Sequence, residues 1–176
     1  MLRGDAWGHG STVVREVLAA EGFSAGAAGL SPETLFGLPG GEPQSVAALR
    51  LTGTVLSVKI LRAGEGVSYG YAYRASRDTR IALVTGGYAQ GIVRALGNRA
   101  DVMVAGERHP IVGRVAMDVC VVEIADAELE RGDDVLLLGD HGRGEPCVAE
   151  WAEATGLLAA ELITAVGLRA MREVAP

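Results

Sequence analysis

Three tyrosines at alternate positions, Tyr69, Tyr71 and Tyr73, are the residues of this sequence best suited to acid–base chemistry. A phenol gives up its proton only near about pH 10 in water, so a tyrosine that acts as a base needs a nearby cation. Cations are available in the same part of the chain, at Arg62, Arg74, Arg77, Arg94 and Arg114. The alternative interpretation is that the three rings share one face of a strand and only pack the fold.

Other kinds of site find less support in the sequence. The histidines, His9, His109 and His141, lie far apart and share no metal-ligand spacing, so we expect no metal site. Cys120 and Cys147 are the only cysteines, too few for a disulfide framework.

Composition excludes several classes of protein. Hydrophobic residues make up 49% of the sequence and charged residues 22%, as in an ordinary globular protein. The formal net charge of −6 argues against nucleic acid or an acidic membrane surface as a partner. No run approaches the roughly 18 apolar residues of a membrane helix, and the first residues do not resemble a signal peptide. We therefore expect a cytoplasmic protein.

The chain divides into two regions of different pattern. In residues 11–20 the apolar positions follow a helical spacing, and the turn-rich segment GLPGGEP at 37–43 reads as a linker. The expected domains are therefore 1–45 and 46–176.

From residue 46 onward the apolar positions alternate with polar ones, which is typical of strands with one buried face. Several short strands separated by turns predict an antiparallel sheet closed into a barrel or sandwich, and residues 147–163 are expected to form a helix. The strand candidates are 56–60, 67–73, 81–84, 102–105, 111–117, 119–124 and 135–138.

Three segments resemble those of a known enzyme family, the alanine racemases. Glu65–Tyr73 (EGVSYGYAY) resembles the segment with the catalytic tyrosine, and 86–91 (GGYAQG) resembles the segment that places a tyrosine at the substrate entryway. Pro110–Asp118 (PIVGRVAMD) resembles the signature whose methionine amide meets the substrate carboxylate. The three occur in the family's order and spacing, so together they are a strong signal.

The resemblance implies a fold and a site. The fold is mainly β, an alanine racemase C-terminal-domain-like β barrel with a C-terminal helix and a short βα remnant at the N-terminus. Tyr69 takes the catalytic position and Tyr88 the entryway, while Gln90 replaces the family's usual aspartate. Met117 and Asp118 take the carboxylate-binding position, and Arg114 is placed to assist it.

The same resemblance implies that pyridoxal phosphate (PLP) is not bound. In the segment LRGDAWGHG, Arg3 stands where the family has its Schiff-base lysine, and Trp7 where it has a phosphate-binding tyrosine. Leu30 replaces the arginine that faces the pyridine nitrogen, and Ala160 replaces a second phosphate tyrosine. A guanidinium cannot form a Schiff base, and fewer than 50 residues precede the β region, against about 200 or more in a (β/α)₈ barrel. We expect neither cofactor nor metal.

Two hypotheses follow. The first is a cofactor-independent acid–base enzyme, an isomerase or cyclase, that acts on a small carboxylated metabolite through Tyr69. The second is a non-catalytic binding or scaffold protein that uses the family's dimer surface. PLP-dependent racemisation is a third alternative, against which the substitutions argue. In each case we expect a homodimer, since loss of the barrel exposes apolar surface.

Overall fold

The computed structural model describes residues 4–22 and 31–173 of the 176-residue chain. Two short helices, α1 (Ser11–Ala20) and α2 (Pro32–Phe36), precede the β-rich part, and two more, α3 (Val148–Thr155) and α4 (Ala159–Gly167), follow it. The strands between them are β1 (Leu51–Leu61), β2 (Gly66–Val67), β3 (Tyr73–Arg74), β4 (Thr79–Thr85), β5 (Asp101–Val104), β6 (Glu107–Pro110), β7 (Val119–Glu123) and β8 (Asp134–Leu138).

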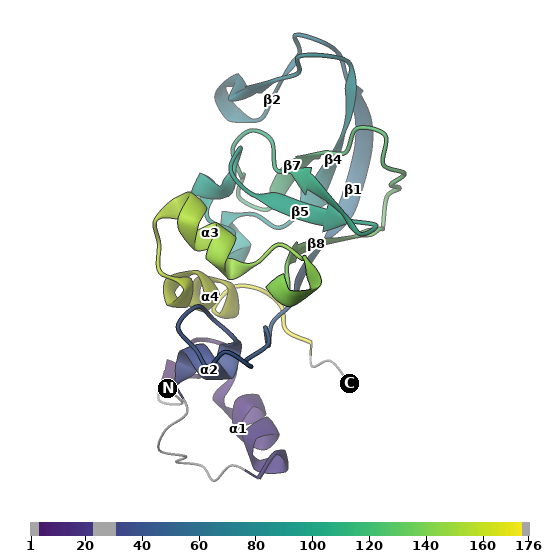
Figure 1. The fold of residues 1–176 in the computed structure, drawn as a ribbon. Coiled ribbons are helices and arrows are strands. Elements are labelled where there is room, and N and C mark those ends of the chain that lie inside the picture. Colours follow the sequence, from purple (N-terminus) through teal and green to yellow (C-terminus); the bar gives the residue numbers. More distant parts are fainter. Residues whose placement is uncertain (1–3, 23–30, 174–176) are drawn as a thin grey trace.

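Six of these strands form one antiparallel sheet in the order β6-β5-β8-β1-β4-β7 (Figure 1). The long strand β1 pairs with β8 through its first half and with β4 through its second half. Past the end of β6, Ile111 forms an antiparallel bridge to Val122 of β7, which is the opposite edge of the sheet. The two edges therefore meet and the sheet curls into a barrel, as the sequence predicted.

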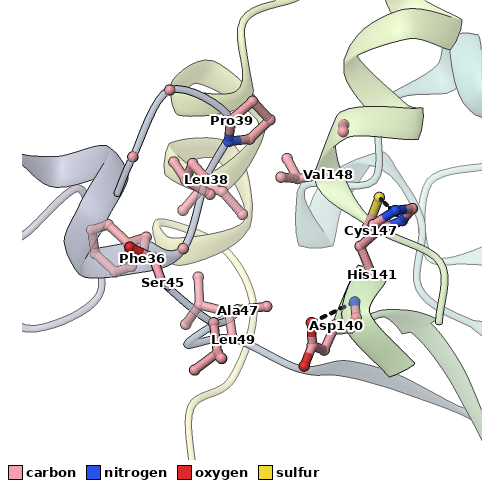
Figure 2. A pocket seen from close by; sticks show the side chains of 18 of the residues that line it. Phe36, Leu38, Pro39, Ser45, Ala47, Leu49, Asp140, His141, Cys147 and Val148 are labelled. Atoms are coloured by element: carbon pink, nitrogen blue, oxygen red, sulfur yellow. Dashed lines mark hydrogen bonds between the residues drawn. The ribbon is translucent and has the colours of Figure 1, made fainter. Parts of the chain in front are cut away.

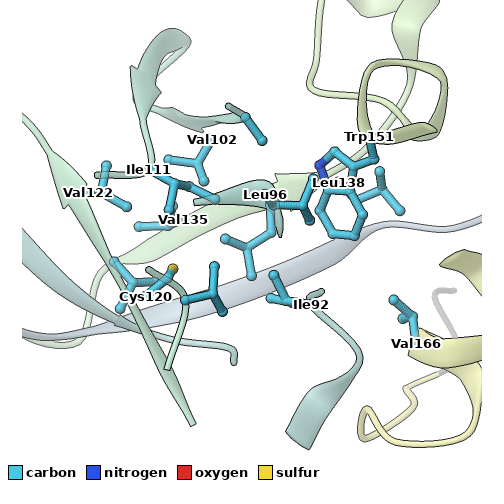
Figure 3. Close-up of a cluster of buried hydrophobic side chains, with 14 of the residues drawn as sticks. Ile92, Leu96, Val102, Ile111, Cys120, Val122, Val135, Leu138, Trp151 and Val166 are labelled. Atoms are coloured by element: carbon cyan, nitrogen blue, oxygen red, sulfur yellow. The ribbon is translucent and has the colours of Figure 1, made fainter. Parts of the chain in front are cut away.

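The interior of the barrel is filled by buried hydrophobic side chains of the strands (Figure 3). In β7, for example, Cys120 and Val122 are buried while their neighbours are half-exposed, which is the period-two pattern of a pleated strand. The helices α3 and α4 contribute Trp151, Leu162 and Ile163 to the same cluster, each at most 2% exposed. The expected mainly β fold with helices at its C-terminal end is thus confirmed.

The single helix predicted for residues 147–163 is wrong in one respect, because the chain forms two helices there. Gly156 ends α3 in the left-handed conformation, with φ 74° and ψ 8°. A glycine adopts this conformation without steric cost, and it commonly terminates a helix.

Two predicted strands are also wrong. Residues 67–73 do not run straight, since Ser68, Gly70 and Tyr71 all have positive φ and a 3₁₀ turn separates β2 from β3. Residues 111–117 form only the bridge at Ile111, after which Gly113 turns the chain at φ 75°. An alternating apolar pattern does not reveal such turns, because residues without special turn preferences occupy some of the positive-φ positions.

The N-terminal segment and the tyrosine-bearing hairpin β2–β3 lie at opposite ends of the molecule (Figure 1). Of the expected βα remnant, the described residues contain the helix α1, while Phe36 and Leu38 join the main core and Trp7 packs against it. Among the helices described, none combines the length and apolar character needed to span a membrane.

Candidate functional site

The hairpin β2–β3 carries the tyrosines, but it does not place them on one face. Tyr69 and Tyr71 lie in its 3₁₀ turn and are 68% and 65% exposed. Tyr73, in β3, is half-buried beside a small second cluster formed by buried side chains that include Leu61 and Val112. The interpretation of all three rings as packing residues therefore holds for Tyr73 only.

Tyr73 has a structural partner. Its hydroxyl donates a hydrogen bond to Oε2 of Glu123 at 2.9 Å. Burial and this contact with a carboxylate raise the pKa of Tyr73 above its ordinary value. Tyr73 thus stays protonated and fastens the hairpin to β7.

The segment 113–118 connects the two loops that hold Tyr69 and Tyr88. At one end, Ser68 Oγ donates to the carbonyl of Arg114 and accepts from its amide, both at 2.8 Å. At the other end, the amides of Tyr88 and Ala89 donate to the carbonyls of Ala116 and Met117 at 3.0 and 2.8 Å. The family positions expected to share a site are therefore carried by adjoining backbone segments.

Gly87 allows the backbone of the Tyr88 loop to lie close to the backbone of Ala116 and Met117. A Cβ atom on Gly87 would overlap the carbonyl oxygen of Met117. Gln90 closes the same loop, since its Oε1 accepts from the amide of Gly87 at 2.9 Å and its Nε2 donates to Asp118 at 3.2 Å. Asp118 therefore accepts a hydrogen bond that stabilises this turn. The Met117 side chain is 55% exposed.

Positive charge lies on this face. The guanidinium of Arg94 is 5.5 Å from the ring centre of Tyr88, and that of Arg74 is 5.5 Å from the ring centre of Tyr71. Nη1 of Arg114 lies 4.0 Å from the position a Cβ on Gly70 would take, beside the tyrosine turn. Such a face suits a carboxylate or another small anion.

The residues at the PLP positions do not fit the cofactor. Trp7 and Ala160 line one shallow cavity of about 410 Å³, but the Trp7 ring stacks on Phe36 at 5.6 Å and Ala160 has no donor to offer a phosphate. The only lysine of the sequence, Lys59, lies exposed in β1. Arg3 and Leu30, the other two substituted positions, lie outside the described residues.

Comparison with known proteins identifies the family. The family model described as "Alanine racemase, C-terminal domain" matches residues 48–174. The chain belongs to the alanine racemase family. The alanine racemase of Thermobifida fusca is 43% identical over 144 residues, which cover 82% of this chain and 37% of the relative. That of Frankia casuarinae is 38% identical over 160 residues, covering 91% and 40%.

Solved alanine racemases share the fold. The enzyme from D-cycloserine producing Streptomyces lavendulae superimposes with a TM-score of 0.67 at 40% identity, covering 77% of this chain and 34% of that one. The enzyme from E. faecalis gives a TM-score of 0.70 at 34% identity, covering 77% and 38%. The chain thus spans about two-fifths or less of the length of the alanine racemases it matches, and it corresponds to their C-terminal domain.

The hypothesis of a cofactor-independent isomerase or cyclase is wrong. The relatives that match this chain are named alanine racemase, and neither they nor the family model points to another reaction. That hypothesis rested on the altered PLP positions. Altered residues at expected cofactor positions give no evidence for a new reaction.

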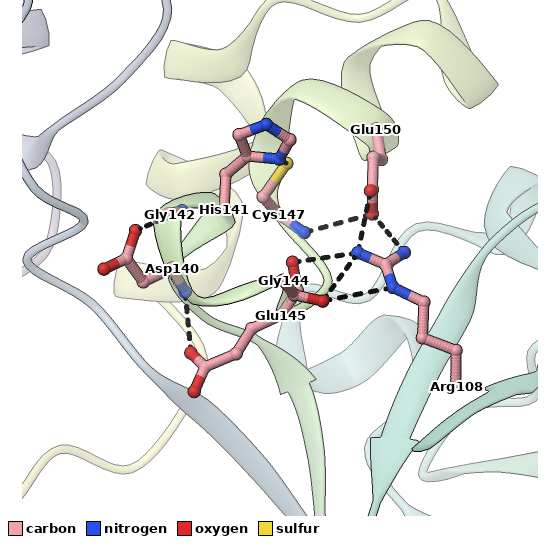
Figure 4. Close-up of polar contacts among 8 residues, drawn as sticks. All are labelled: Arg108, Asp140, His141, Gly142, Gly144, Glu145, Cys147 and Glu150. Carbon is pink, nitrogen blue, oxygen red and sulfur yellow. Dashed lines mark hydrogen bonds and ion pairs between the residues drawn. The ribbon is translucent and has the colours of Figure 1, made fainter. Parts of the chain in front are cut away.

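Sequence reasoning missed one cluster of polar side chains, which lies where the chain passes from β8 to α3. It contains His141, Cys147 and Glu150, whose ligand atoms all lie within 4.8 Å of one another (Figure 4). The histidines were compared only with each other, and a search for mixed His, Cys and Glu sets at short spacing would have found it.

Proposed function

We propose that this chain performs the C-terminal domain's share of alanine racemisation. In this proposal Tyr69 acts as acid and base towards the α-carbon of alanine, and the backbone at Met117 holds the substrate carboxylate. The barrel that completes the site lies outside these 176 residues. The chain pairs with a second copy or with such a barrel, in the cytoplasm.

The proposal rests mainly on the side chains at the three positions that match the racemase site. They are exposed, while hydrogen bonds hold their backbone segments together. Tyr69, Tyr88 and Met117 are 68%, 37% and 55% exposed. Their backbones are nevertheless joined through the hydrogen bonds of segment 113–118. Reactive groups on a rigid support that remain open to a partner are what a divided active site requires.

The charges on this face support the same proposal. Alanine carries a carboxylate, and the guanidinium groups of Arg94 and Arg114 border the exposed tyrosines. Apolar and aromatic side chains exposed together, at Tyr69, Tyr71, Tyr88 and Met117, also favour a partner surface at this end of the barrel.

A complementation assay tests the proposal. The purified chain is mixed with the Thermobifida fusca racemase shortened to its PLP-bearing barrel, and formation of D-alanine from L-alanine is followed by chiral chromatography. We expect the mixture to racemise alanine faster than the barrel fragment alone. Tyr69→Phe should lower that gain by about 10²–10⁴-fold, which is typical of a general acid–base group.

Tyr71→Phe is the matched control, because Tyr71 lies in the same turn and is equally exposed. It should leave the gain intact, and neither change should alter the thermal unfolding temperature much, since each removes an exposed hydroxyl. Failure of the chain to bind the barrel fragment in light scattering would overturn the proposal. Equal activity of the Tyr69→Phe and unaltered chains would remove Tyr69 from the mechanism.

A further inference from the structure

The cluster of His141, Cys147 and Glu150 lies where β8 leaves the sheet and α3 begins. Between β8 and α3 the chain makes a tight turn. The amide of Asp140 donates to Oε2 of Glu145 at 2.8 Å, and the amide of Gly139 donates to the carbonyl of Pro146 at 2.7 Å. The turn brings together two ligand-type side chains that are six residues apart in the sequence.

Buried charge holds this turn in place. Glu145 is 6% exposed and forms an ion pair with Arg50 at 2.7 Å. A Cβ on Gly139 would overlap the same carboxylate, so the strand end and the turn pack without a gap. The Arg50 side chain is 51% exposed, so the support comes mainly from Glu145, whose carboxylate accepts from the amide of Asp140 inside the turn.

The sulfur and imidazole nitrogen of this cluster have nearly the separation found in a small metal site. Sγ of Cys147 lies 3.8 Å from Nδ1 of His141 (Figure 4). In a tetrahedral zinc site with Zn–S of about 2.3 Å and Zn–N of about 2.0 Å, sulfur and nitrogen are about 3.5 Å apart. The pair can thus accept an ion with a shift of a few tenths of an ångström.

Glu150 is oriented by its neighbours. Arg108 donates to both of its carboxylate oxygens at 2.9 and 3.0 Å, and the amide of Cys147 donates to one of them at 3.2 Å. Carboxylates that bind metal usually accept such additional hydrogen bonds, and Oε1, which accepts only from Arg108 with which it forms an ion pair, keeps a lone pair for the ion. Arg108 therefore acts as the positioning residue for this ligand.

The cluster opens on a cavity. His141 and Cys147 line a space of about 570 Å³ whose other walls are the loop Phe36–Ala47 and the start of α3 (Figure 2). Glu150 does not line this cavity. Three protein ligands with one position open to a cavity are the pattern of zinc sites that bind an external ligand.

We propose that His141, Cys147 and Glu150 bind a thiophilic divalent cation, with Zn²⁺ as the best match, and leave one coordination position facing the cavity. A sulfur and imidazole donor set selects zinc over magnesium or calcium, which prefer oxygen ligands alone. The second cysteine is unsuited to this role, because it lies in the core and burial raises the pKa of Cys120 to about 12.

Calorimetric titration of the full, tag-free chain with Zn²⁺ tests the site. We expect one ion per chain, with affinity lowered more than about 100-fold by Cys147→Ser or His141→Gln, which remove ligands, and by about 10–100-fold by Arg108→Gln, which removes only the support of Glu150. Co²⁺ in place of Zn²⁺ should give a thiolate-to-cobalt absorption band that Cys147→Ser abolishes. Circular dichroism checks that each variant is folded.

Alkylation of cysteines gives an independent measurement. Zn²⁺ should protect Cys147 from iodoacetamide, while Cys120 should stay unlabelled in the folded chain with or without the ion. Unchanged zinc affinity in both the Cys147→Ser and His141→Gln variants would overturn the proposal. So would alkylation of Cys147 at the same rate with and without saturating zinc.

Discussion

The Nε2 atom of His9 lies 3.0 Å from the carbonyl oxygen of Ile163, so a side chain near the start of the chain is fastened to the last helix. The imidazole is 8% exposed and its ring centre lies 5.1 Å from that of Phe36. A Cβ on Gly167 of the same helix would contact the histidine ring. This contact ties the N-terminal segment to α4 and the core.

The buried position of His9 predicts a pH dependence of stability. Burial lowers the pKa of His9 below its ordinary value of 6.5, although the contact with the Ile163 carbonyl acts in the opposite direction. The unfolded chain then takes up the proton more readily than the folded chain. The free energy of unfolding should be highest above about pH 6.5 and should decrease as the pH falls from there through the lower, folded-state pKa.

Urea unfolding of the unaltered chain and of His9→Gln, measured at intervals between about pH 5 and pH 7, checks this. The variant should be less stable at neutral pH, but its stability should depend less on pH over this interval. Parallel curves for the two proteins would show that His9 is not the group responsible.

Gly87 provides a second prediction, on the packing of the candidate site. Its backbone is extended, at φ −133° and ψ −168°, so alanine is conformationally acceptable there and only the clash with the Met117 carbonyl matters. We expect Gly87→Ala to lower the free energy of unfolding by about 1–3 kcal/mol, the usual cost of overpacking. Gly4→Ala is the control, since nothing lies within 4 Å of a Cβ there. Equal stabilities of the two variants in urea would contradict the packing described.

The cofactor positions predict that this chain by itself does not take up PLP. Lys59 is the only lysine, and it is exposed in β1 rather than beside Trp7 and Ala160. The purified protein should be colourless, and borohydride treatment with stoichiometric PLP should yield no labelled lysine peptide in mass spectrometry. A saturable yellow absorption band that is lost in Lys59→Arg would show that a specific cofactor site exists.

Strands such as β7 could be predicted from the sequence because their burial alternates residue by residue. The hairpin was predicted as one straight strand, because an alternating apolar pattern does not show the positive φ of Ser68, Gly70 and Tyr71. The racemase-like segments placed Tyr69, Tyr88 and Met117 in one region, and backbone hydrogen bonds do link those segments. The roles of these residues, and the domain boundary at residue 45, stay predictions.

The cluster at His141 shows the same limit. Its spacing from Cys147 has no periodic pattern, and the two side chains meet only because Glu145 and Arg50, which are 95 residues apart, hold the turn closed. A contact of that sequence separation depends on the whole sheet being in register. The short spacing of His141, Cys147 and Glu150 is visible in the sequence, but nothing local to it shows that their ligand atoms lie within 4.8 Å of one another.

The last prediction concerns assembly. Tyr69 and Tyr71 of the β2–β3 turn, together with Tyr88 and Met117, are exposed large hydrophobic side chains, and the hairpin lies at the end of the molecule farthest from the N-terminal helices (Figure 1). Surfaces of this kind are generally buried against a partner, and two identical faces can bury each other around a two-fold axis. We expect light scattering to give a homodimer at micromolar concentration, and we expect Tyr71→Glu to convert it to a monomer.

Ile60→Glu is the control for this prediction. Ile60 lies on β1 and is 58% exposed, and its change should leave the dimer intact. If the unaltered chain is monomeric at that concentration, this face does not mediate self-association, and a partner of another kind must cover it.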